Sequence, residues 1–122
     1  MKGYKVLGYA LLMIEETVAK IQRAVRTAGQ MDPKHKAELV VLLERLEAEI
    51  RALPASQAEK AHSIAQFAEA ATNEAARRDK SAKLLMLSRG ALKESVSDFE
   101  TSHPKLTAIV NEICTLLAGI GI

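Results

Sequence analysis

Each of the three histidines follows an acidic residue by three positions, a spacing that can place a carboxylate and an imidazole on one helix face. The pairs are Asp32 with His35, Glu59 with His62, and Glu100 with His103. Two Glu-x-x-His motifs and two further glutamates build the di-iron or di-manganese site of ferritin-like bundles. The spacing therefore makes Glu59, His62, Glu100 and His103 weak candidate metal ligands. We favour the competing interpretation, in which each pair caps a helix start, and expect no cofactor.

The sequence around His103 favours a structural role for this residue. Pro104 follows it directly, and because a residue before proline avoids the helical region, a tight corner between two helices is predicted here. We expect Glu100, His103 and Pro104 to fix that corner, with the imidazole hydrogen-bonded to Glu100 or to a free backbone group.

The chain offers no credible catalytic nucleophile, so we do not expect an enzyme. Cys114 falls beside the apolar stripe of the last predicted helix, where burial would raise its pKa. The six glycines are scattered and form no phosphate-binding loop. Because the chain has one cysteine, it cannot form an internal disulfide, which favours a reducing compartment. We expect a cytoplasmic protein.

A basic block with an apolar centre is the stronger indication of a binding function. Its basic residues, which surround the single acid Asp79, are Arg77, Arg78, Lys80, Lys83, Arg89 and Lys93. Residues 84–87 are all apolar, and four successive residues span the circumference of a helix, so Met86 and Leu87 must point away from the face of Leu85. Such a segment can bind anionic lipid or an acidic helix. Nucleic acid is disfavoured because no aromatic residue is interleaved for base stacking.

Composition and periodicity predict that helices position these residues. The chain has 122 residues, of which 48% are hydrophobic, only 3% are aromatic and 20 are alanine, which argues against a β-sandwich or barrel. Apolar residues recur at helical spacing over residues 4–28, from Pro33 to about Leu53, and from Pro104 onward. The short connection at Asp32-Pro33 predicts that the first two helices are antiparallel neighbours.

Residues 56–100 allow two interpretations. Ser56 and Glu59 form a predicted capping box, and nothing after it forces the helix to stop before Glu100. One continuous helix would be about 67 Å long, whereas a break near Asp79–Ser81 would give two helices of matching length. We therefore predict an all-α antiparallel bundle of four helices, or five if the third helix breaks. It forms a single domain over residues 1–122, in which residues 1–12 could be an addition before a start at Met13.

The end of the chain resembles a known family. The shared pattern is F-E-x-x-H-P-x-L, then a short amphipathic helix and a terminal G-I, carried here by Phe99, Glu100, His103, Pro104, Leu106, Gly121 and Ile122. It is similar to the C-terminal half of an uncharacterised bacterial family, domain of unknown function 4404. The most specific resemblance covers residues 96–122, the last 27, and the helix around Leu39 to Leu53 also looks like an earlier helix of the family. We do not extend the resemblance over the alanine-rich stretch 56–76. It implies a small helical bacterial protein with no assigned activity.

Three functions follow, in order of preference. The first is a structural or interaction module that forms a homodimer. Its candidate contact residues are Met86 and Leu87, together with Leu11 and Ile14 on a heptad seam that the second helix is too short to cover. The second is a peripheral binder of anionic surfaces through residues 77–93, although a net charge of +2 is too balanced to indicate nucleic acid. The third is a metal-dependent enzyme with Glu-x-x-His ligands.

Overall fold

The computed structural model describes the backbone of residues 2–120 and the side chains of residues 12–120. Within that range the chain forms five α-helices, two short 3₁₀ turns and no strand. Their order is α1 (Lys2–Thr27), α2 (Pro33–Arg51), η1 (Ala55–Gln57), α3 (Ala58–Ala76), α4 (Ala82–Ser95), η2 (Ser97–Phe99) and α5 (Pro104–Ile120). The predicted all-α bundle is confirmed, and the predicted third helix is broken.

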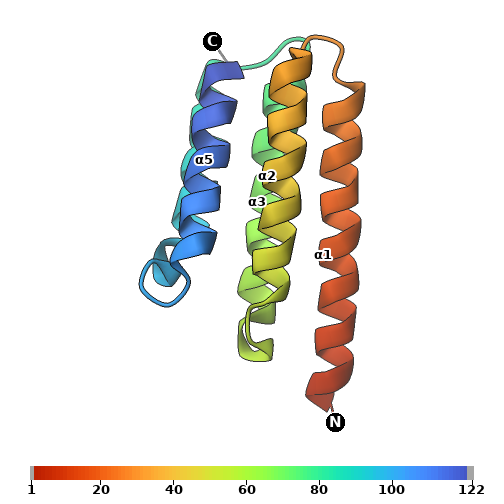
Figure 1. Ribbon diagram of the computed structural model, residues 1–122, viewed down its shortest axis with the longest axis vertical. Helices are drawn as coiled ribbons and strands as arrows, with labels where there is room; N and C mark the ends of the chain where they lie inside the picture. Colours follow the sequence, from red (N-terminus) through yellow and green to blue (C-terminus); the bar gives the residue numbers. More distant parts are fainter. Residues whose placement is uncertain (1, 121–122) are drawn as a thin grey trace.

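The helices alternate in direction along the chain, so α1, α3 and α5 run one way and α2 and α4 the other (Figure 1). Around the bundle, α1 packs against α2 and α3, α2 packs against α5, and α4 packs against α3 and α5. The first two helices are thus antiparallel neighbours, as their short connection predicts. By contrast, α2 and α3 follow one another in the chain but make their main contacts with other helices.

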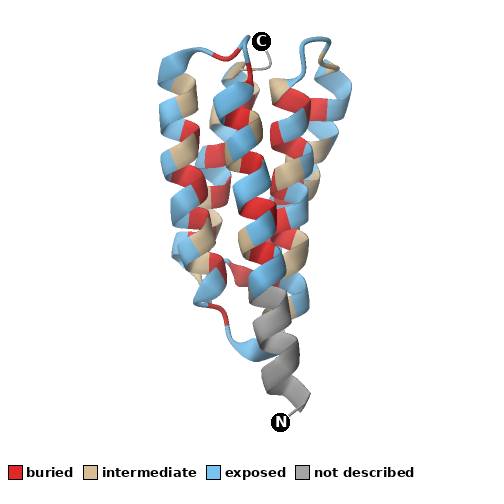
Figure 2. Ribbon diagram, turned by 90° about the vertical axis from the view of Figure 1, so that its right-hand side faces the viewer, coloured by how far each residue is buried: buried red, intermediate tan, exposed pale blue. Residues whose placement is uncertain are grey.

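The core lies along the inward faces of all five helices (Figure 2). On α1, Ile14, Val18, Ile21 and Val25 are at most 1% exposed. The facing helix α3 contributes mainly alanines to the core, namely Ala61, Ala65, Ala68, Ala71 and Ala75. Small side chains allow neighbouring helices to approach closely, which explains why α3 can pack against both α1 and α4.

Local capping signals set three of the helix starts. The Asp32 carboxylate accepts a hydrogen bond from the Lys34 backbone N–H at 2.9 Å, and Pro33 occupies the first helical position of α2. The Ser81 hydroxyl accepts from the Leu84 backbone N–H at 3.1 Å and caps α4, so the break falls within the predicted region Asp79–Ser81. Pro104 begins α5, as predicted.

The predicted capping box at Ser56 and Glu59 is wrong. After Pro54 the chain first forms the turn η1, closed by a hydrogen bond from the Gln57 N–H to the Pro54 carbonyl at 2.9 Å. Helix α3 then starts at Ala58 with Gln57 as N-cap, and the Gln57 side chain makes no capping hydrogen bond. Because η1 takes up Ser56, its hydroxyl is no longer placed to cap the helix.

Candidate interaction surface

The outer surface of α4 carries the largest concentration of exposed large apolar side chains in the described part of the chain. Leu84, Met86 and Leu87 are 50%, 57% and 54% exposed. Phe67 on the adjacent helix α3 is 39% exposed. The predicted exposure of Met86 and Leu87 is confirmed. Phe67 and Leu84 were not among the predicted surface residues, although helical spacing places Phe67 off the alanine stripe of α3.

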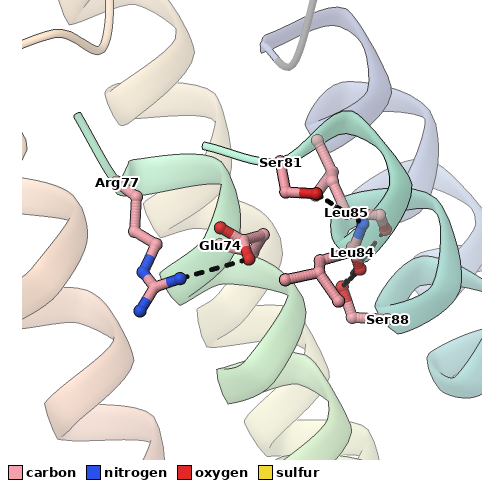
Figure 3. Close-up of polar contacts among 6 residues, drawn as sticks. All are labelled: Glu74, Arg77, Ser81, Leu84, Leu85 and Ser88. Carbon is pink, nitrogen blue, oxygen red and sulfur yellow. Dashed lines mark hydrogen bonds and ion pairs between the residues drawn. The ribbon is translucent and has the colours of Figure 1, made fainter. Parts of the chain in front are cut away.

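The cap at Ser81 and the buried side of α4 together determine which residues face outward. Leu85, Leu92 and Val96 form a buried line along this helix. Because an α-helix has about 3.6 residues per turn, Leu87 lies on the side opposite that line. Leu84 lies on a flank and extends toward α3, next to Glu74 (Figure 3). The four consecutive apolar residues therefore split between the core and the surface, as their number requires.

Glu74 is a buried carboxylate on the side of α3 that faces α4 (Figure 3). Its side chain is only 8% exposed, and Oε1 accepts a hydrogen bond from Arg77 Nη1 at 3.4 Å. Oε2 is also buried and has no hydrogen-bond partner among the described residues. Since Arg77 is 63% exposed, this ion pair is solvated at the guanidinium end and enclosed at the carboxylate end. An enclosed acidic group thus lies next to Leu84, on the side of α3 that faces α4.

Two of the six basic residues of the block are partly enclosed and four are exposed. Lys80 is half-buried, and its Nζ donates hydrogen bonds to the carbonyl oxygens of Ala75 at 3.4 Å and Ile120 at 3.2 Å. It therefore ties together the C-terminal ends of α3 and α5, where a cation complements the helix dipoles. Arg89 is half-buried with its Nε enclosed. The members that remain exposed are Arg77, Arg78, Lys83 and Lys93.

The candidate metal ligands come to the same end of the bundle. An ion pair between Lys60 Nζ and Asp98 Oδ2 at 3.1 Å joins the start of α3 to η2, so both Glu-x-x-His pairs lie near it in the chain. Within residues 12–120, however, no group of three or more histidine, cysteine or acidic side chains is close enough to hold a metal ion. Glu59, His62, Glu100 and His103 thus do not assemble into a metal centre in this structure.

The corner before α5 is held through Phe99 and Ser102. The His103 backbone N–H donates to the Phe99 carbonyl at 2.8 Å, and its Nδ1 lies 3.0 Å from the Ser102 hydroxyl. The imidazole also packs edge-on against the Phe99 ring, with centroids 5.6 Å apart. Glu100 is exposed, and among the described residues the imidazole bonds to the Ser102 hydroxyl and to neither predicted partner, Glu100 or a backbone group. His103 nonetheless lies in a tight corner between helices, and Pro104 begins α5 directly after it.

Ile14 and Leu11 on α1 were the other residues predicted to contact a second copy. Ile14 is 1% exposed and belongs to the core, so its prediction as a contact residue for a second copy was wrong. The Leu11 side chain lies outside the described residues. From Ile14 to Val25 the heptad seam of α1 is buried within the chain, where α1 packs against α2 and α3.

Cys114 behaves as a small apolar side chain on α5. It is 1% exposed, and its thiol donates to the Arg89 carbonyl at 3.6 Å. Burial raises the pKa of the Cys114 thiol, and the positive charges of Lys93 and Arg89 oppose that shift without cancelling it. A protonated, enclosed thiol is a poor nucleophile, as the sequence predicts.

The fold and the surface define a class of protein: an all-α bundle whose exposed features are an apolar helix face and scattered basic residues. A family model described as a domain of unknown function (DUF4404) matches residues 39–122, more than half of the chain, and the protein belongs to that family. The match runs through α3, so the expectation that the resemblance stops short of the alanine-rich stretch was wrong. No curated protein and no solved structure matches the chain. None of the described helices has the length and apolar character needed to cross a membrane.

Proposed function

We propose that this protein is a helical interaction module that self-associates through the outer surface of α4. The observation that carries the proposal is the run of Leu84, Met86 and Leu87, each at least half exposed on one short helix. Single exposed apolar residues are common, but a contiguous group of large ones marks a contact surface. In a homodimer with two-fold symmetry, the same patch would be buried against its own copy.

The second candidate, binding to an anionic surface, has less support from the geometry. Peripheral binding requires several cationic side chains that reach one plane together with apolar ones. Here Lys80 bonds to two backbone carbonyls, and Arg77 shares its charge with Glu74. Arg78, Lys83 and Lys93 are exposed and remain the residues that such a function would use.

Sedimentation equilibrium over a wide concentration range tests the first proposal. We expect a concentration-dependent mass above the 13.3 kDa of the single chain. Leu87→Glu should abolish the rise in mass while leaving the helical circular dichroism unchanged. Val41→Glu is the matched control, because Val41 is 45% exposed on α2 and receives the same charge away from α4.

Two results would contradict this proposal. One is a mass that stays at 13.3 kDa into the high micromolar range. The other is salt-sensitive cosedimentation of the parent with anionic phospholipid vesicles, lost in Arg78→Glu with Lys83→Glu, which would assign the surface to membrane binding instead.

A further inference from the structure

The outermost line of α4 has a charge at each end and two apolar positions between them. Lys83, Leu87, Gly90 and Glu94 are all exposed and are separated by four, three and four residues. This spacing places them on one face of the helix, opposite buried Leu85 and Leu92. Within the described residues, neither Lys83 nor Glu94 forms an ion pair.

Gly90 lacks a reason to be glycine within the single chain. It lies inside a helix, where glycine is less favourable than alanine. A Cβ added at this position would meet no described heavy atom within 4 Å, and none of the described glycines has a positive φ. The space that its missing side chain leaves is open to the outside, so it is available to a neighbouring helix.

From this arrangement we infer that two copies of the chain pair α4 against α4 in antiparallel orientation across a two-fold axis. This inference rests on the proposed self-association and adds its geometry. Along the helix, the axis lies at the level midway between Ser88 and Arg89. Lys83 and Glu94 are equally far from this level, and so are Leu87 and Gly90. Each Leu87 then lies over Gly90 of the second copy, and each Lys83 lies opposite Glu94 of the second copy. The face is therefore complementary to itself in shape and in charge.

The flanks of this face agree with the same pairing. Leu84 and Ala91 lie on the side of α4 toward α3, and in the antiparallel arrangement Leu84 comes beside Ala91 of the second copy. Leu84 is 50% exposed in the single chain and would be covered there. Small residues on one helix thus receive large residues of the other on both the central line and this flank.

The competing seat for α4 is a shallow depression of about 440 Å³ between α2 and α5 of a second copy. It contains Val41 and Leu42 and is bordered by the acidic residues Glu38 and Glu112, which would attract Lys83, and by Arg45, which would repel it. That contact would join two different surfaces and would generate open chains or rings instead of a closed dimer. We favour the two-fold pairing because it also accounts for Gly90 and Glu94.

A charge-swap experiment tests the pairing. Dissociation constants are measured by sedimentation equilibrium at low salt for Lys83→Glu, Glu94→Lys and the double variant. Each single reversal should weaken the dimer by roughly tenfold, because the repulsive pair occurs twice per dimer, and the double variant should return to within about threefold of the parent. Lys105→Glu, an exposed residue on α5, is the control and should have no effect.

A second variant tests the close approach at Gly90 independently of charge. Gly90→Leu should keep or raise the helix content of the single chain and should weaken the dimer by about tenfold or more. If Leu87→Glu dissociates the dimer but neither charge reversal nor Gly90→Leu affects it, the pairing is wrong and the proposed function stands. If Val41→Glu also dissociates it, or if open assemblies larger than a dimer form, the contact with α2 and α5 replaces this pairing. A parent that remains monomeric overturns both.

Discussion

Replacing Thr72 by valine should stabilise the protein, because the threonine hydroxyl is buried without a partner. Thr72 lies inside α3 on the alanine-lined face and is 0% exposed. Its Oγ1 has no hydrogen-bond partner among the described residues. Valine has nearly the same shape and a similar helix propensity, so the substitution removes an unsatisfied polar group and retains the packing.

The magnitude follows from the cost of an unsatisfied buried group. Leaving a buried donor or acceptor unpaired costs about 1–3 kcal/mol, and we expect Thr72→Val to recover about 1–2 kcal/mol of it. For a chain of this length, an unfolding entropy of about 2.1 cal/mol/K per residue converts 1 kcal/mol into about 4 °C. The expected rise in Tm is therefore about 4–8 °C. Thr72→Ala should instead lose about 1 kcal/mol, because it also removes a buried methyl group.

Urea denaturation followed by circular dichroism, at one fixed protein concentration, measures the free energy of unfolding directly. Thr115→Val is the matched control. Thr115 is exposed on α5 and its hydroxyl donates to the Asn111 carbonyl at 2.9 Å, so its replacement should change stability by less than about 0.5 kcal/mol. A loss of stability in Thr72→Val with a flat control would refute the reasoning and would show that the hydroxyl bonds to a buried water.

Three further predictions concern helix ends and the buried thiol. His103→Ala and Pro104→Ala should each lower the unfolding free energy by about 1 kcal/mol, with no change in metal content by elemental analysis; metal lost with His103→Ala would contradict the structural role. Ser81→Ala should cost about 1 kcal/mol in the same urea assay, because α4 loses its N-cap, and an unchanged midpoint would show that the cap is dispensable. Cys114 should react much more slowly with a thiol reagent in the folded protein than in concentrated guanidinium. Burial raises the pKa of the folded Cys114 thiol above the ordinary value of 9.0. The stability that the protonated thiol contributes should therefore be intact below pH 9.0 and fall as the pH rises through the folded pKa. Cys114→Val should not show this fall in stability.

Helix existence could be predicted from the sequence more securely than helix limits. Asp32-Pro33 and Pro104 are strong start signals because proline restricts the backbone whatever surrounds it. The break at Ser81 remained one of two alternatives, because the sequence offers a capping hydroxyl there and yet nothing that forces the helix to stop. Tertiary packing decides it, because the broken form lets α3 and α4 pack side by side. The capping box at Ser56 failed for a related reason, since Pro54 favoured a separate turn that local pattern matching does not weigh.

Surface residues were predictable only where sequence spacing left no alternative. Met86 and Leu87 had to leave the core because four consecutive apolar residues cannot share one face. Ile14 belongs to a heptad seam, and such a seam looks the same whether its partner helix comes from the same chain or from another copy. Here α3 of the same chain covers it with small alanine side chains, which the pattern of the seam alone does not indicate. The sequence indicates only that Gly90 lowers the helix propensity of its segment. That no described atom lies within 4 Å of an added Cβ follows from the structure alone.

The order of helices around the bundle also constrains how the chain folds. Helix α1 lies against α3 with all of α2 between them in sequence, and α2 lies against α5 with both α3 and α4 between them. Contacts between such distant segments close long loops and form late, whereas the α3–α4 and α4–α5 hairpins close short ones. The C-terminal three helices should therefore assemble first, and the hairpin of α1 and α2 should dock onto them in the final step. Backbone amides around Val18 and Ile21 would then gain protection from hydrogen exchange last, and the native protein would first open along the α1–α3 and α2–α5 interfaces together.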